Sequence, residues 1–154
     1  MEITHKELAN LLKVAYKTKQ PLFIWGTTGI GKSQNVRKTA QMIANEDGLQ
    51  LNESGDEKGF GLTTIMVSQL DPSDLRGLPT VKDGATKWLP PNWLPKQGKG
   101  ILFFDELNLA PPSIQSSAYQ LILDRKLGDY VLPEGWLIVS AGNRLEDRAN
   151  VFDL

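Results

Sequence analysis

The sequence contains no cysteine and one histidine, His5, among its 154 residues. The absence of thiols excludes a disulfide framework and a thiolate metal site, and a lone histidine does not favour a zinc site. The 17 Lys and Arg residues nearly balance the 18 Asp and Glu residues, which leaves a net charge of −1. This balance gives no sign of a basic surface for nucleic acid, so we expect no nucleic-acid partner.

Long apolar runs are also missing, so no segment is expected to cross a bilayer. The first residues, Met1 to Lys6, lack the apolar stretch of a signal peptide. We therefore expect a cytoplasmic protein with no membrane partner. Hydrophobic residues make up 40% of the chain, and its length suffices for one domain with a buried core. We treat residues 1–154 as one domain.

A glycine-rich motif fits the phosphate-loop pattern G-x-x-x-x-G-K-[ST] at every fixed position. Such a loop turns successive backbone N–H groups toward one anion, and the helix that follows adds the positive end of its dipole. We expect Lys32 to contact the β- and γ-phosphates of a nucleotide and Ser33 to bind Mg²⁺. The predicted nucleotide-binding residues are Gly26, Thr27, Thr28, Gly29, Ile30, Gly31, Lys32, Ser33 and Gln34.

The segments on either side of this motif have the patterns that a phosphate loop requires. Residues 21–25 are an apolar run, which is typical of a buried strand. Apolar residues then recur at helical spacing from 36 to 43, which predicts a helix directly after the loop. An earlier helix is predicted to begin at a capping box formed by Thr4 and Glu7, and its apolar stripe is expected to pack against the sheet.

Two carboxylates follow a second apolar run. Residues 101–104 predict another buried strand, and Asp105 and Glu106 stand at its end. Because ligands of parallel α/β sheets bind at the carboxyl ends of the strands, we expect these acids to lie beside the phosphate loop. Asp105 is then predicted to hold the Mg²⁺ shell, as in the Walker B motif, and Glu106 to orient or deprotonate an attacking water.

A third apolar run, residues 136–141, ends at Gly142 and Asn143. The side-chain amide of Asn143 can both donate and accept hydrogen bonds, so at this edge it could bind a water and the γ-phosphate together. The alternative is that Asn143 is an ordinary turn residue after the strand. Spacing alone does not decide between the two.

The remaining segments predict further elements. These are a polar surface loop (51–61), a strand (63–68), a hairpin around Asp83-Gly84, a helix that begins at Pro111-Pro112 and stops at Gly128, and a hairpin over 127–135. The tryptophan in the proline-rich connector 90–95 either recognises a partner or covers the edge of the core. Strands and helices alternate, so we predict an α/β, three-layer P-loop NTPase core with a mostly parallel sheet, helices on both faces and hairpin inserts.

Together these motifs resemble the AAA+ ATPases and, among them, the MoxR-type proteins. The resemblance rests on the Walker A segment 26–33, the Walker B acids 105–106 and the sensor 1 segment 140–143. It implies catalytic roles for Lys32, Glu106 and Asn143, with Asn143 as the sensor. Residues 70–79 resemble the segment before the helix-2 insert of MoxR-type proteins, and the hairpin 82–88 would be that insert.

The resemblance implies ATP and Mg²⁺ as cofactors, ATP hydrolysis, a ring-shaped homo-oligomer and the remodelling of a protein partner, which in this family often carries a von Willebrand A domain. In the family an arginine finger, a fifth core strand and a helical lid follow sensor 1, whereas this chain ends at Leu154. We therefore expect a partial core with the phosphate-loop strand at the sheet edge. We also expect weak turnover, because the finger normally comes from a neighbouring subunit.

Two alternatives use the same loop differently. A small P-loop kinase needs an acceptor site and usually an arginine-rich lid, and the sequence shows no such cluster. A nucleotide-dependent binding module for protein or DNA would not depend on hydrolysis. The near-neutral net charge argues against DNA, because phosphate contacts require basic side chains.

Overall fold

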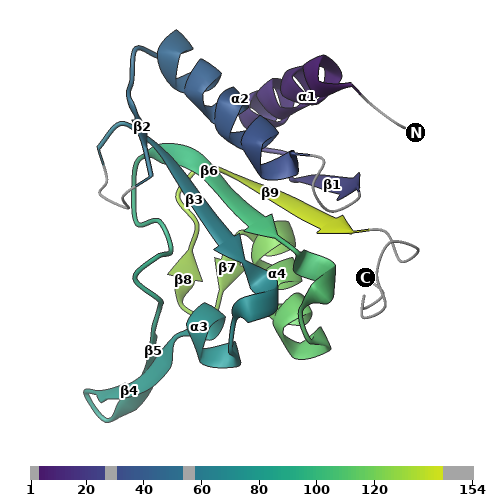
Figure 1. Cartoon of the computed structure of the whole chain (residues 1–154). Helices are drawn as coiled ribbons and strands as arrows, with labels where there is room; N and C mark the ends of the chain where they lie inside the picture. The colour runs from purple at the N-terminus through teal and green to yellow at the C-terminus, as the bar shows by residue number, and fades with distance from the viewer. Residues whose placement is uncertain (1–3, 27–30, 54–57, 144–154) are drawn as a thin grey trace.

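The computed structural model describes residues 4–26, 31–53 and 58–143. Its main sheet has five parallel strands in the order β1-β9-β6-β3-β2. These strands are β1 (Leu22–Gly26), β2 (Leu51–Asn52), β3 (Phe60–Met66), β6 (Lys99–Asp105) and β9 (Gly135–Asn143). Figure 1 shows α1 (His5–Thr18) and α2 (Lys32–Glu46) on one face of this sheet and α4 (Pro112–Asp124) on the other. The predicted three-layer α/β fold is confirmed.

The central strands are buried on both faces, which explains why they read as continuous apolar runs. Side chains alternate along β6, so that Phe103 packs into the core under α1 and α2 while Leu102 and Phe104 pack into the core under α4. All three are fully buried. Among the described residues, β1 lies at one end of the sheet order.

The first helix begins where the sequence predicts. The hydroxyl of Thr4 accepts a hydrogen bond from the backbone N–H of Glu7 at 3.2 Å, and the carboxylate of Glu7 accepts one from the N–H of Thr4 at 2.8 Å. The helix ends at Lys19, whose backbone is left-handed with a φ of 56°. Its apolar stripe, which includes Leu8 and Leu12, packs into the core between α1, α2 and the sheet.

The prediction of a strand over 63–68 was wrong at both ends. The strand β3 runs from Phe60 to Met66, so the segment predicted as a surface loop contains β2 and the start of β3. Phe60 pairs with Lys99 on β6 and is fully buried, which draws this polar-looking segment into the sheet. Gly61, which pairs with Gly100 on β6, lies against the ring of Trp136: a Cβ there would lie 2.3 Å from the indole.

The end of α4 also differs from the prediction. Arg125, not Gly128, ends the helix, with a left-handed φ of 57°. Its guanidinium donates to the carbonyls of Pro133 and Trp136 at 2.9 and 2.8 Å, and these tertiary contacts stabilise a conformation that favours glycine. Gly128 instead lies in the turn between β7 (Lys126–Leu127) and β8 (Tyr130–Val131).

Further elements connect β3 to β6. The chain passes through a 3-10 turn, η1 (Val67–Gln69), and a short helix, α3 (Pro72–Arg76), before the hairpin of β4 (Leu78–Lys82) and β5 (Ala85–Leu89). The predicted tight turn is confirmed, because Asp83 and Gly84 both have positive φ. The hairpin extends away from the sheet (Figure 1) and exposes Leu78, Val81 and Leu89.

None of the helices in the described ranges has the length and hydropathy of a membrane-spanning segment.

Candidate functional site

The three segments singled out by their sequence meet at one edge of the sheet. The strand β1 ends at Gly26, β6 ends at Asp105 and β9 ends at Asn143. Gly26 and Asn143 are paired in register, so the end of the phosphate-loop strand lies directly beside the end of the sensor strand. This edge is the carboxyl edge of a parallel sheet, where ligands of such folds bind.

Lys32, the first residue of α2, points its ammonium at these strand ends. Its Nζ donates to the carbonyl of Gly26 at 3.1 Å, to the carbonyl of Gly142 at 2.9 Å and to Oδ1 of Asn143 at 3.0 Å. The side chain is buried, and the oxygens around it compensate for the loss of water around a charged group. The charge is therefore held at the point where β1 and β9 end.

The described part of the phosphate loop has the backbone that its motif requires. Gly31 caps α2 with a φ of 75°, a conformation available to glycine at little cost. Ser33 and Gln34 lie exposed in the first turn of α2, where their backbone N–H groups have no partner within the helix. Four predicted nucleotide-binding residues lie outside the described residues, namely Thr27, Thr28, Gly29 and Ile30.

Asp105 and Glu106 stand half-buried at the end of β6. Burial raises the pKa of Asp105 above its usual range, while the hydrogen bond from the backbone N–H of Glu106, at 2.8 Å, and the nearby charge of Lys32 act in the opposite direction. Glu106 has a left-handed backbone with a φ of 55°. Its Oε2 accepts a hydrogen bond of 2.6 Å from the hydroxyl of Ser68.

Sequence reasoning missed two residues of this site. Ser68 follows the end of β3 at the same carboxyl edge, and the rule that located Asp105 would also have pointed to it. Asn108 lies in the 3-10 turn η2 (Leu107–Leu109), and its fully buried amide contacts the backbone of Asn143. No local pattern distinguishes this asparagine from an ordinary turn residue. Asn143 itself is not a turn residue, because it is the last residue of β9.

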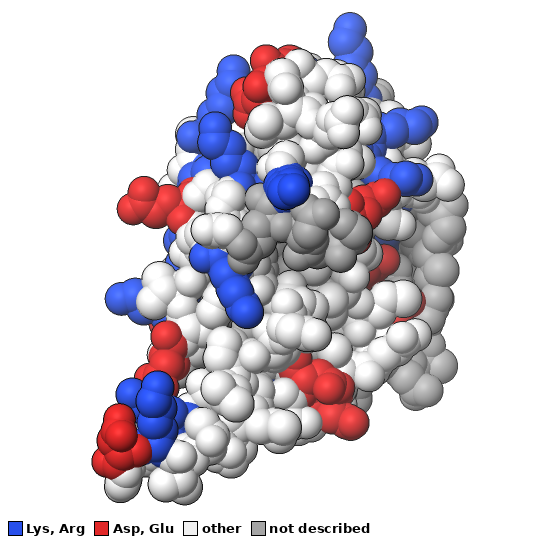
Figure 2. Space-filling model, turned by 90° about the vertical axis from the view of Figure 1, so that its left-hand side faces the viewer, with Lys and Arg blue, Asp and Glu red and all other residues white. Residues whose placement is uncertain are grey.

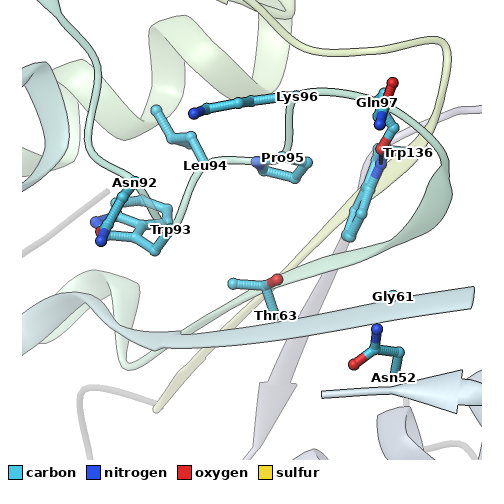
Figure 3. Close-up of a pocket in the computed structure, with 10 residues that line it drawn as sticks. All are labelled: Asn52, Gly61, Thr63, Asn92, Trp93, Leu94, Pro95, Lys96, Gln97 and Trp136. Carbon is cyan, nitrogen blue, oxygen red and sulfur yellow. Dashed lines mark hydrogen bonds between the residues drawn. The ribbon is translucent and has the colours of Figure 1, made fainter. Parts of the chain in front are cut away.

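A hollow of about 180 Å³ lies elsewhere on the molecule. Figure 3 shows Trp93 and Trp136 on either side of it, with Thr63 of β3 below. Gly61 and Trp136, which also line it, are near the starts of β3 and β9, so the hollow is at the opposite end of the strands from Asp105 and Asn143. Trp93 packs against the core on the α4 side of the sheet, which favours the interpretation that this side chain covers the edge of the core.

Charged side chains are interspersed over the face shown in Figure 2. Among the described residues on that face, Lys and Arg side chains lie next to Asp and Glu side chains, most visibly at the lower left. The described residues on this face therefore form no patch of a single sign.

The topology and the lysine at the strand ends define an α/β fold of the P-loop NTPase type. The family model of the AAA domain, dynein-related subfamily, matches residues 21–152, and the chain therefore belongs to this family. Membership of an AAA family supports nucleotide binding by this domain, in addition to the phosphate-loop motif.

Solved structures have the same fold. A candidate ATPase from Cytophaga hutchinsonii is similar with a TM-score of 0.62 and 18% identity, over 97% of this chain and 42% of that one. NtrX from Brucella abortus is similar with a TM-score of 0.55 and 17% identity, over 96% of this chain and 32% of that one. The chain thus spans less than half the length of either protein. No curated protein matched.

Proposed function

We propose that this AAA domain binds ATP together with Mg²⁺ and hydrolyses the γ-phosphate, as the motor module of a MoxR-type remodelling chaperone. The observation that carries the proposal is the position of Lys32, whose ammonium is surrounded by oxygens from the ends of β1 and β9. A cation held there, next to a glycine-capped helix N-terminus, favours the binding of a polyphosphate.

Each side chain has a distinct task in the proposed reaction. The backbone of residues 26–34 holds the phosphates, and Lys32 exchanges some of its protein oxygens for phosphate oxygens. Glu106 accepts the proton of a water whose oxygen attacks the γ-phosphorus, while the bond to the β–γ bridging oxygen breaks and the electron pair leaves with ADP. The amide of Asn143 contacts the γ-phosphate and thereby distinguishes ATP from ADP.

The residues present fit a magnesium ion. Mg²⁺ prefers oxygen ligands and usually combines one or two protein oxygens with substrate phosphates and water. Within the described ranges no group of three histidine or acidic side chains gathers at one point, so phosphate oxygens would complete the shell. The carboxylate of Asp105 and the hydroxyl of Ser33 would hold the ion, which would neutralise charge on the phosphates.

Nucleotide binding is tested by titrating the purified chain with a fluorescent ATP analogue in the presence of Mg²⁺. Lys32→Ala is expected to weaken binding at least about tenfold, because a charge-assisted contact is lost. Lys38→Ala is the matched control, since Lys38 is exposed on the same helix. Equal affinity of the wild type and Lys32→Ala would refute the proposed site.

Hydrolysis is tested separately under single-turnover conditions with labelled ATP, which detect slow reactions. Glu106→Gln is expected to bind ATP normally and to lose the phosphate release that the wild type shows. The wild-type rate itself is expected to be slow, since an arginine finger normally comes from a neighbouring subunit and contributes ~10³–10⁵ in GTPases. Fast turnover by the purified chain would overturn this expectation. Phosphate transfer to an added acceptor instead of water would favour the kinase alternative.

The MoxR assignment has separate support. The α3 helix and the β4–β5 hairpin interrupt the core between β3 and β6, where the resemblance implies a helix-2 insert, and the β7–β8 hairpin precedes β9.

A ring is expected to form only with nucleotide, which mass measurements with and without Mg·ATP would detect. A protein partner with a von Willebrand A domain is part of the same proposal, and its test is co-purification with this chain. A persistent monomer that binds ATP would instead favour a fragment of the family's core.

A further inference from the structure

One buried side chain holds both backbone polar groups of the proposed sensor residue. Oδ1 of Asn108 accepts a hydrogen bond of 3.0 Å from the backbone N–H of Asn143, and Nδ2 of Asn108 donates one of 2.5 Å to the carbonyl of Asn143. Asn108 is fully buried, and Asn143 is 3% exposed. The amide of Asn108 therefore has a donor and an acceptor matched to a single peptide backbone.

The sheet leaves a place for this contact. On its β6 side, β9 is paired only as far as Ser140, which lies opposite Phe104. On its other side the ladder continues to Asn143, opposite Gly26. The end of β9 thus extends beyond β6, and its backbone groups need partners other than a strand. Asn108, three residues after the last residue of β6, supplies them.

Gly142 makes room for this arrangement. A Cβ at position 142 would lie 2.7 Å from Oδ1 of Asn108 and 3.0 Å from its Cγ, closer than a side chain can approach without displacing the amide. A glycine before the sensor residue is thus needed for the close approach of Asn108, independently of any turn.

We propose that Asn108 is the positioning residue of the γ-phosphate sensor. It fixes the backbone of Asn143, so that only the side chain of Asn143 is able to move from Lys32 to the γ-phosphate. Asn108 lies two residues after Glu106, so the same contact also fixes the position of the proposed base relative to the proposed sensor. The inference rests on the proposed function and names no new ligand; it assigns the residue through which the sensor acts.

The test compares the affinities for ATP and ADP, measured by titration with Mg²⁺ for the full chain. Asn143→Ala is expected to reduce the preference for ATP over ADP about tenfold, the loss of one hydrogen bond to a charged group. Asn108→Ala and Gly142→Ala are expected to reduce the same ratio to a similar extent while ADP affinity stays within about twofold. Single-turnover hydrolysis is expected to slow in parallel. A merely structural role would lower stability without changing this ratio.

Gln115→Ala is the matched control. Gln115 is also a buried amide, and its Nε2 donates to the carbonyl of Ala110 at 2.8 Å, but it makes no hydrogen bond to Asn143. Its removal is expected to lower the melting temperature and to leave the ATP preference unchanged. If Asn108→Ala does not fold, Asn108→Asp, which keeps the shape and the acceptor but loses the donor, takes its place.

The outcomes separate the two proposals. A wild-type ATP preference in folded Asn108 and Gly142 variants, with a reduced preference in Asn143→Ala, overturns the positioning role alone. A wild-type preference in Asn143→Ala overturns the sensor role of Asn143 and with it the positioning role of Asn108. The phosphate-binding role of the loop is tested separately, by the ATP affinity of Lys32→Ala. A reduced preference in Gln115→Ala would show that any buried defect has this effect, and would also overturn the inference.

Discussion

The ammonium of Lys32 lies 3.0 Å from Oδ1 of Asn143, although the two residues are 111 positions apart in the chain. The contact joins the first turn of α2 to the end of β9. It places the proposed phosphate-binding charge and the proposed sensor amide within one hydrogen bond of each other. Because Lys32 must contact phosphate to support nucleotide binding, whatever competes for its ammonium is expected to affect affinity.

Asn143→Asp makes this competition measurable. A carboxylate in place of the amide would form a buried ion pair with Lys32, which a phosphate would have to displace. We expect ATP affinity to fall at least about tenfold, while the stability of the nucleotide-free protein is maintained. Calorimetric titration and thermal unfolding check the two parts. An ATP affinity equal to that of the wild type would show that Lys32 does not exchange partners.

Ser68→Ala tests the hydrogen bond to the proposed base. The hydroxyl of Ser68 occupies Oε2 of Glu106 at 2.6 Å and directs this carboxylate toward the end of β3. Without the hydroxyl, the carboxylate is free to turn toward an attacking water, so we expect single-turnover hydrolysis to increase a few-fold with unchanged ATP affinity. Ser116→Ala is the control, because Ser116 is exposed on α4. A slower reaction would mean that Ser68 holds Glu106 in its active orientation.

Asp105→Asn is expected to stabilise the nucleotide-free protein at neutral pH. Burial raises the pKa of Asp105 in the folded state, so the ionised carboxylate destabilises the fold, and stability falls as pH rises from the pKa in the unfolded chain through that in the folded state. The melting temperature of the variant should exceed that of the wild type by a few degrees at pH 7. The difference should shrink as pH approaches about 3.9 or below.

Mg·ATP should raise the melting temperature of Asp105→Asn less than that of the wild type. Mg·ATP stabilises the wild type by binding the folded state, whereas the variant lacks the proposed metal-binding carboxylate and should gain less. Thermal unfolding over a pH series, with and without Mg·ATP, measures both effects. A variant that is less stable than the wild type without nucleotide at pH 7 would contradict the burial argument.

Gly61→Ala tests the close approach of the Trp136 ring to the start of β3. The added methyl would lie 2.3 Å from the Trp136 ring, so we expect a destabilisation of about 1–3 kcal/mol from overpacking. In a Trp136→Leu background the same change should cost clearly less, since the ring is absent. Urea denaturation of the four proteins gives the coupling free energy. Additive effects would show that the ring does not restrict position 61.

The sequence was sufficient for the α/β class, the order of the main elements and the motif residues, because these depend on local patterns. The run 101–104 is apolar since it is buried on both faces, and the helix after the phosphate loop follows from the helical spacing of its apolar residues. The prediction that Lys32, Asp105 and Asn143 meet at one edge of the sheet followed from the parallel topology. Their proposed roles remain predictions that the experiments above test.

Tertiary structure alone decided three points. The strand β3 begins at Phe60 because of its register with β6 and the burial of the Phe60 side chain, neither of which is a local property. Arg125 ends α4 because its guanidinium donates hydrogen bonds to two carbonyls beyond the β7–β8 hairpin, those of Pro133 and Trp136. Asn108 contacts Asn143 because β9 extends past β6. Local sequence determines which backbone conformations are favourable. The partners of a buried polar group depend instead on how far each strand extends relative to its neighbours in the sheet.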